Sequence, residues 1–268
     1  MLKDITLGQY FPGDTIAHRL DPRTKILLTT LYIVALFSAN GFVSYAVMIA
    51  CLILSVRLAN VPPRAMVRGL RPVLFIIVFT AVLNLFFTPG GREFFRWGFL
   101  TVTETGIKTA LFMVLRIMLL IMGTFLMTYT TSPISLTDAL ESLLNGLKRF
   151  RVPVHELSMM MSIALRFIPT LIEETDKIMS AQKARGADLE GGNLMQRAKA
   201  MIPILVPLFV SAFRRADELA TAMECRCYHG GEGRTRLHVL RYQRRDYNAL
   251  AIGGVICVCV FVLGRLGW

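Results

Sequence analysis

Apolar runs separated by short polar connections dominate the first half of the chain and return at its end. They cover residues 26–39, 42–56, 73–88, 106–130 and 248–263. A helix crosses a bilayer with about 20 mostly apolar residues. The run at 106–130 is longer than this, and the other runs approach that length with their flanking residues. The pattern predicts four transmembrane helices in the first half of the chain and one more at its end.

The intervening segment has a different pattern. An amphipathic helix is expected at 138–150, and two long helices at 155–185 and 194–223 are separated by a glycine-rich break. In the first long helix, apolar positions recur every three or four residues and acidic residues form a separate polar region. This arrangement is typical of a helix that lies against a surface.

Composition agrees with a membrane protein, because 54% of the residues are hydrophobic and the mean hydropathy is +0.54. Charge concentrates in residues 131–247, which hold 17 of the 30 Lys and Arg and 13 of the 18 Asp and Glu. We therefore predict an all-α membrane protein of about five transmembrane helices. Its parts are a four-helix membrane part at 1–130, a module of long amphipathic helices at 131–247, and a last transmembrane helix at 248–268.

Basic residues flank the apolar runs. Four arginines crowd the connection after the second run, whereas the turn before that run is uncharged. The positive-inside rule then places the N-terminus and the 131–247 module in the cytoplasm and the C-terminus outside. The net charge of +12 is attributed to this topology and to contact with lipid, and nucleic acid is not expected as a partner.

Four local features carry their own expectations. Asp21 and Pro22 are suited to the cap and first position of a helix, and Pro169 should kink or restart its helix. The Asn84 side chain is expected to form a hydrogen bond to a neighbouring transmembrane helix. The aromatic residues at 94–99 are expected to form an interfacial belt in a loop.

Arg116 interrupts the fourth apolar run near its middle. A charged residue there usually faces protein or water, so pairing within the helix bundle is the simplest interpretation, and a role in substrate passage is the alternative. An intramembrane enzyme acting on a lipid or peptide would need a convergent set such as Arg116, His155 and Glu156. That enzyme and a membrane-anchored adaptor without transport are the competing functions.

Sequence motifs for ATP hydrolysis and for hydrolytic catalysis are missing. The chain has no phosphate-binding Gly-x-x-x-x-Gly-Lys-Ser/Thr run, no nucleophile elbow and no His-Glu-x-x-His. Cys225, Cys227 and His229 are not followed by a second ligand pair at metal spacing, so no metal site is expected.

Both long helices end in an arginine between small residues. The first ends in Ala184-Arg185-Gly186 and the second in Cys225-Arg226-Cys227. A cation at a helix C-terminus is also explained locally by the helix dipole and a glycine cap. Two such ends in one polar module favour a second interpretation, in which each exposed guanidinium enters a groove of a partner.

These residues resemble a known family. Residues 18–25 (HRLDPRTK), 164–171 (ALRFIPTL) and 181–186 (AQKARG) are similar to the transmembrane coupling subunit, or T component, of energy-coupling factor (ECF) vitamin transporters. That family carries two Ala-Arg-Gly-like motifs at the ends of its cytoplasmic coupling helices. Arg185 and its neighbours match the motif fully, whereas the second motif keeps only its central residue, Arg226.

The resemblance implies an assembly in a bacterial cell membrane. It would contain this chain, two ABC-type ATPases that bind ATP and magnesium, and an exchangeable substrate-binding membrane subunit. The chain itself would bind no cofactor and would couple ATP hydrolysis to uptake. A methionine-rich face suits docking of the exchangeable subunit, because methionine repacks easily, and an internal core is its alternative. The residues of this face are Met159, Met160, Met161 and Leu165.

Overall fold

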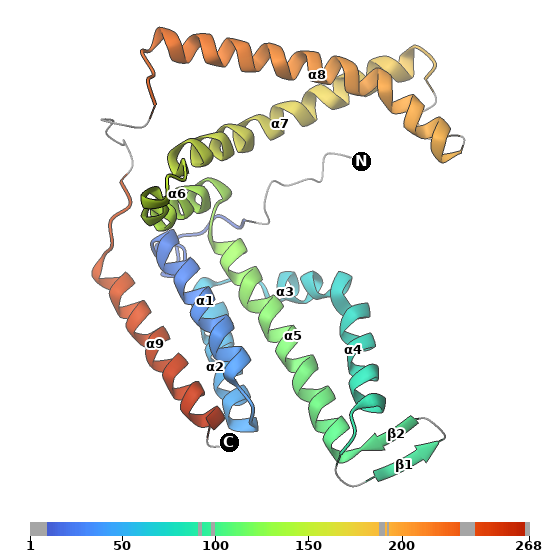
Figure 1. Ribbon diagram of the computed structural model, residues 1–268, viewed down its shortest axis with the longest axis vertical. Helices are drawn as coiled ribbons and strands as arrows, with labels where there is room; N and C mark the ends of the chain where they lie inside the picture. Colours follow the sequence, from blue (N-terminus) through green and yellow to red (C-terminus); the bar gives the residue numbers. More distant parts are fainter. Residues whose placement is uncertain are drawn as a thin grey trace. The chain divides into compact units, whose positions relative to one another are not determined.

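Helices form almost all of the regular structure in the computed structural model of the chain (Figure 1), which describes residues 10–90, 93–97, 100–187, 191, 193–230 and 239–265. The α-helices are α1 Pro22–Ser38, α2 Phe42–Ala59, α3 Pro63–Leu70, α4 Leu74–Phe87, α5 Glu104–Thr130, α6 Pro133–Leu144, α7 Val154–Ala184, α8 Leu194–Cys225 and α9 Arg244–Arg265. Two short 3-10 helices are η1 Arg71–Val73 and η2 Asn145–Phe150, and two strands are β1 Glu93–Trp97 and β2 Leu100–Thr103.

The chain divides into two compact units. The bundle unit comprises Gly8–Leu136 and Leu240–Trp268 and contains α1 to α5 and α9. The hairpin unit is built on Thr137–Val239 and contains α7 and α8. Each is described by itself below.

In the bundle unit, α5 is the common neighbour of α1, α2, α3 and α4, and α9 packs along α1 and α2. Leu36, Tyr45, Met48 and Val260 are almost fully buried where these helices meet. The absence of a side chain at Gly123 permits a close approach of α1 and α5, because a Cβ there would collide with the ring of Tyr32.

The predicted fold class is confirmed. Within the described residues, the stretches long and apolar enough to cross a membrane are α2, Pro63–Phe87, α5, Met195–Cys225 of α8, and α9. Helix α1 has 17 residues, at the lower limit for a span. The apolar stretch of α8 is followed by a charged second half.

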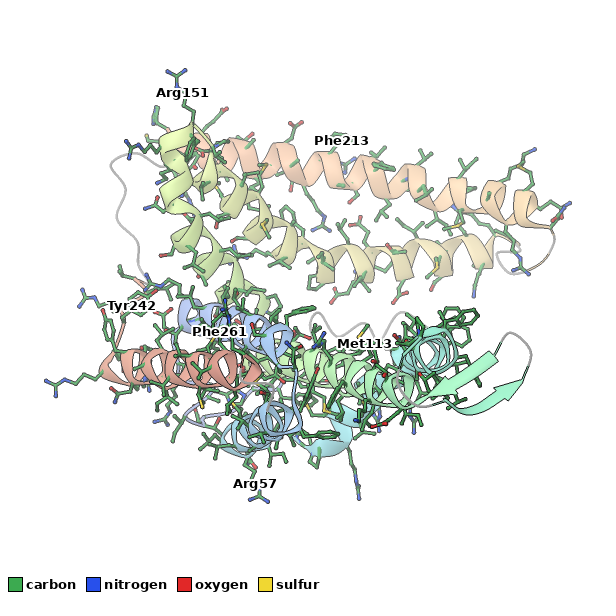
Figure 2. All side chains as sticks on the ribbon, turned by 60° about the horizontal axis from the view of Figure 1, so that its bottom comes forward. Arg57, Met113, Arg151, Phe213, Tyr242 and Phe261 are labelled. Carbon is green, nitrogen blue, oxygen red and sulfur yellow. The ribbon has the colours of Figure 1, made fainter. Side chains whose placement is uncertain are left out.

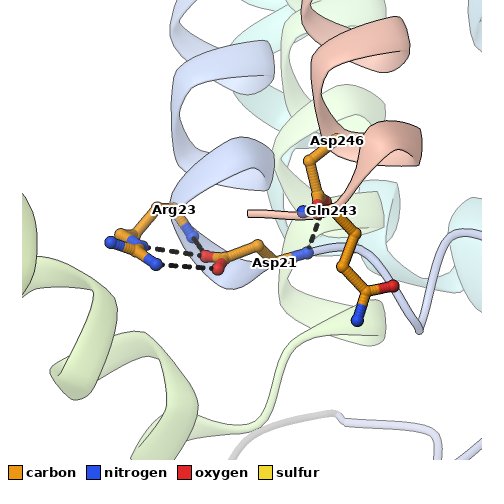
Figure 3. A network of polar contacts seen from close by, with 4 residues as sticks. All are labelled: Asp21, Arg23, Gln243 and Asp246. Atoms are coloured by element: carbon orange, nitrogen blue, oxygen red, sulfur yellow. Dashed lines mark hydrogen bonds and ion pairs between the residues drawn. The ribbon is translucent and has the colours of Figure 1, made fainter. Parts of the chain in front are cut away.

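A polar network ties the start of α1 to the start of α9 (Figure 3). The Asp246 carboxylate accepts the backbone N–H of Asp21 and of Gln243, both at 2.8 Å. Asp21 caps α1 by accepting the backbone N–H of Arg23 at 2.9 Å, and it also pairs with the Arg23 guanidinium. Asp246 is 1% exposed, so these bonds replace the water that a buried carboxylate needs. The predicted cap at Asp21, with Pro22 in the first helical position, is confirmed.

At Pro169, where the sequence predicts a kink or a restart, α7 runs on to Ala184 without a restart. Three other local expectations are corrected. The Asn84 amide donates to Thr80 O of its own helix at 2.8 Å rather than to a neighbouring helix. The aromatic segment expected as a loop contains β1 and β2, paired antiparallel. The amphipathic helix begins at Pro133, a residue favoured in a first turn, and η2 replaces its expected end.

Candidate functional site at two arginine-bearing helix ends

The end of α7 is closed by a hydrogen-bond pattern known as a Schellman motif. The N–H of Gly186 donates to Lys183 O at 3.0 Å, and the N–H of Ala187 donates to Gln182 O at 3.0 Å. Gly186 has φ +85°, the left-handed conformation that glycine adopts without a steric cost. Arg185 is the cap residue just before this turn.

The end of α8 has the same pattern. The N–H of Cys227 donates to Glu224 O at 2.8 Å, and the N–H of Tyr228 donates to Met223 O at 3.1 Å. Cys227 has φ +54° and takes the place that Gly186 has in α7. Arg226 therefore occupies the same cap position as Arg185, although its flanking residues differ.

Both arginines are exposed, as are the small residues on either side of them. Within the described part of the chain, neither guanidinium has an ion pair or a side-chain hydrogen bond. Each therefore offers five N–H donors in a planar fork to a carboxylate or carbonyl of another molecule.

The two ends lie far apart on one antiparallel pair of helices. Figure 1 shows α8 running back across α7 in the opposite direction. The Tyr228 hydroxyl contacts Met159 Sδ at 3.0 Å near the start of α7, and Gln182 near its end donates to Pro203 O. Arg226 thus lies beside the start of α7 and Arg185 at its end. At 1.5 Å per residue, the two are about 40 Å apart.

A polar clamp holds the middle of this pair together. Glu174 of α7 accepts hydrogen bonds from the Ser211 hydroxyl and, at 3.0 Å, from Arg215 Nη2, both on α8. The Ser211 bond and then the Arg215 guanidinium hold the pKa of Glu174 below its ordinary value. From the sequence, Glu174 belongs to the polar region of the first long helix, and its contact with α8 was not predicted. No sequence signal pairs Glu174 with Ser211 and Arg215, because the periodicity of each helix does not fix how the two pack.

Comparisons with known proteins agree along the whole chain. Residues 13–237 match the family described as cobalt transport protein, CbiQ. A protein of Clostridium kluyveri, named energy-coupling factor transporter transmembrane protein EcfT, is 53% identical over 100% of this chain and 99% of its own. The chain belongs to this family of transmembrane (T) components of ECF transporters. A protein of Acidaminococcus fermentans with the same EcfT name is 54% identical over 98% of this chain and 96% of its own. Another of that name, from Bacillus subtilis, is 47% identical over 98% of this chain and 99% of its own.

The methionine face of this T component is only partly open. Met160 and Met161 are 57% and 47% exposed, whereas Met159 contacts Tyr228 and Leu165 is half-buried. Within the hairpin unit, the two exposed methionines are therefore free to contact another molecule.

The residues of the enzyme alternative have other partners in the T component. Arg116 bonds to Tyr45 and to Ala39 O in the bundle unit. His155 Nδ1 lies 3.0 Å from a carboxylate oxygen of Glu141, not of Glu156. Glu141 is 8% exposed, so this pair ties the start of α7 to α6. No group of three or more His, Cys, Asp or Glu able to hold a metal ion occurs among the residues described.

Proposed function

We propose that this T component is the coupling subunit of a vitamin or micronutrient importer. In this role it transmits the ATP-driven motion of two ABC-type ATPases to a substrate-binding membrane subunit. The observation that carries the proposal is that Arg185 and Arg226 end two paired helices with the same backbone geometry. The ATPase-contacting residues are Ala184, Arg185, Gly186, Cys225, Arg226 and Cys227.

Each arginine would enter a groove on one ATPase. A separation of about 40 Å suits two partners side by side better than one partner gripping both ends. Carboxylates or carbonyl oxygens in each groove would accept the guanidinium, which is the chemistry that favours arginine over lysine. ATP and magnesium would bind only to the ATPases, and this chain would bind no cofactor.

Movement of the two ATPases would then displace the ends of α7 and α8. Glu174 and its partners on α8 tie the helices at their middle, so displacement of the ends would change the crossing of the pair. The substrate-binding subunit would dock on Met159, Met160, Met161 and Leu165 and follow that change.

In this arrangement α1 completes five membrane spans with α2, α4, α5 and α9, and α8 lies at the cytoplasmic surface. The excess of Lys and Arg in the 131–247 module supports a cytoplasmic hairpin unit and N-terminus, with the C-terminus outside. The protein would be a multi-pass component of a bacterial cell membrane in contact with lipid, and it would not bind nucleic acid.

The test replaces each arginine and measures both assembly and transport. Arg185→Ala and Arg226→Ala should each weaken ATPase co-purification or uncouple ATP hydrolysis from uptake. Truncating a buried interfacial arginine with a charged partner costs about 2–5 kcal/mol. Arg166→Ala on α7 and Arg214→Ala on α8 are matched controls, because both are exposed arginines away from the helix ends.

Normal assembly and uptake in both single variants and in the double variant would contradict the proposal. The arginines would then act only as helix caps. A loss in the control variants as large as in the end variants would equally contradict a role confined to the helix ends.

A further inference from the structure

Arg116 lies at the level where α1 ends, although it is near the middle of α5. Lys25 Nζ donates to Thr130 O at 2.7 Å, which places the start of α1 beside the end of α5. Arg116 Nη2 donates to Ala39 O at 2.9 Å, just beyond the end of α1. Along α5, Arg116 is about 21 Å from Thr130, which is close to the length of α1. The first three turns of α5 therefore extend beyond the end of α1.

Two hydrogen bonds fix the Arg116 guanidinium. Nε donates to the Tyr45 hydroxyl at 3.0 Å in addition to the bond to Ala39 O. Tyr45 is 2% exposed and stacks on Phe112, with ring centroids 5.0 Å apart and 7° between their planes. The arginine is therefore held in one orientation before any ligand arrives, which lowers the entropy lost on binding.

The charge of Arg116 is not neutralised within the described part of the chain. No carboxylate there forms an ion pair with it, and from Pro22 to Thr130 the sequence contains just two acidic residues, Glu93 and Glu104. Glu104 pairs with Lys108 at 2.7 Å. Arg116 has five N–H groups, of which three have no acceptor among the described residues. An arginine within a membrane helix bundle needs acceptors, water or an opposite charge, and the Ala39 carbonyl and the Tyr45 hydroxyl supply acceptors for two of its five N–H groups.

Arg116 lines a cavity of about 260 Å³. Thr109 lies two turns before Arg116 on the same face of α5. It is half-buried, and its hydroxyl has no hydrogen bond within the described residues. Asn40 adds an exposed amide from the turn before α2. The start of α2 has Gly41 at its cap and no side-chain cap. The cavity is lined by Ala39, Asn40, Tyr45, Thr109, Phe112, Met113 and Arg116.

We propose that this cavity binds a phosphate group through Arg116, with Thr109 and Asn40 as further donors. Arginine matches phosphate oxygens with two parallel N–H bonds. The cavity lies at the turn between the end of α1 and the start of α2, which the proposed topology places at one end of both membrane spans, near the lipid head groups. The phosphate belongs either to a lipid head group or to free phosphate. This site is independent of the two arginine helix ends and of the transported substrate.

The first arm of the test uses inorganic phosphate and the full-length chain in a phosphate-free maltoside detergent. Phosphate, compared with chloride at equal ionic strength, should raise the midpoint of thermal unfolding by about 2–4 °C. Arg116→Gln should lose this rise and Thr109→Val should reduce it. Arg57→Gln is the matched control, because Arg57 is exposed in the last turn of α2 and projects away from the helices (Figure 2).

The second arm identifies the source of the phosphate. Native mass spectrometry should count one more tightly retained phosphatidylglycerol on the wild type than on Arg116→Gln. A phosphate-free diglucosyl diacylglycerol should show no such difference. Retention of the phospholipid supports a lipid phosphate, and a response to inorganic phosphate alone supports a free one.

Equal behaviour of the wild type and Arg116→Gln in both arms overturns the site and leaves Arg116 as a clamp on the α1–α2 turn. If Arg116→Gln does not fold, Thr109→Val decides, since it leaves both arginine bonds in place. A Thr109→Val response equal to that of the wild type in both arms then overturns the site.

Discussion

Substitution of Cys227 tests whether backbone geometry positions Arg226. Cys227 has φ +54°, and an L-residue in this conformation costs about 1–2 kcal/mol relative to its right-handed conformation. Glycine does not have this cost in the folded state. It loses more backbone entropy on folding, however, and this cancels roughly 0.5–1 kcal/mol of the gain. Cys227→Gly should therefore leave the end of α8 nearly unchanged and restore the glycine that the first motif has.

Cys227→Val should have the opposite result. A β-branched residue is a steric outlier at positive φ, and we expect a further cost of about 1–2 kcal/mol for keeping the turn. Because 1.4 kcal/mol is a factor of ten, binding of an ATPase to this helix end should weaken about 5- to 30-fold. Arg226 itself stays in place in this variant.

The assay measures ATPase affinity for the full-length chain in lipid nanodiscs, in an Arg185→Ala background so that binding depends on the α8 end. Gly186→Val is the matched substitution at the other end, tested in an Arg226→Ala background. Unchanged affinity of Cys227→Val, or a larger loss in Cys227→Gly than in Cys227→Val, would refute the role assigned to this turn.

Three further predictions concern other parts of the molecule. Asp246→Ala should lower the free energy of unfolding by about 1–3 kcal/mol, because it leaves the buried backbone N–H of Asp21 without an acceptor. Asp246→Asn should lose less, since one acceptor remains, and equal unfolding midpoints for both variants and the wild type would exclude this role. Because the pKa of Glu174 is lowered, its contribution to α7–α8 pairing is complete at neutral pH and falls as the pH drops through that lowered pKa. Spin-label distances between α7 and α8 should therefore widen in acid below the ordinary Glu range, and should lose this pH dependence in Glu174→Gln; the same acid response in that variant would assign it to another group. Met160→Asp and Met161→Asp should reduce co-purification of the substrate-binding subunit but keep both ATPases, and loss of all partners together would point to misfolding instead.

Local sequence signals predicted the elements that depend on neighbouring residues. Helix periodicity identified α7 and α8, and Asp21 followed by Pro22 marked the start of α1. Gly186 signalled the C-terminal cap of α7. The equivalent cap of α8 has a cysteine at positive φ, so the sequence pointed only to Arg226 and not to the shared geometry.

Contacts between distant residues were not predictable in the same way. The clamp at Glu174 depends on the register of α7 against α8, which periodicity does not fix. The buried position of Asp246 depends on α9 returning to α1 across more than two hundred residues. Arg116 is near the middle of its apolar run, and its place beside the α1–α2 turn follows only from how far α5 extends past α1.

The central claim is that this T component couples two ATPases to a substrate-binding membrane subunit. It is tested most directly by isolating the tagged chain from its native membrane in mild detergent and identifying the bound chains by mass spectrometry. The account predicts two ABC-type ATPases and one or more small, very hydrophobic membrane proteins. Recovery of the chain alone, from a membrane in which other complexes survive the same detergent, would contradict it.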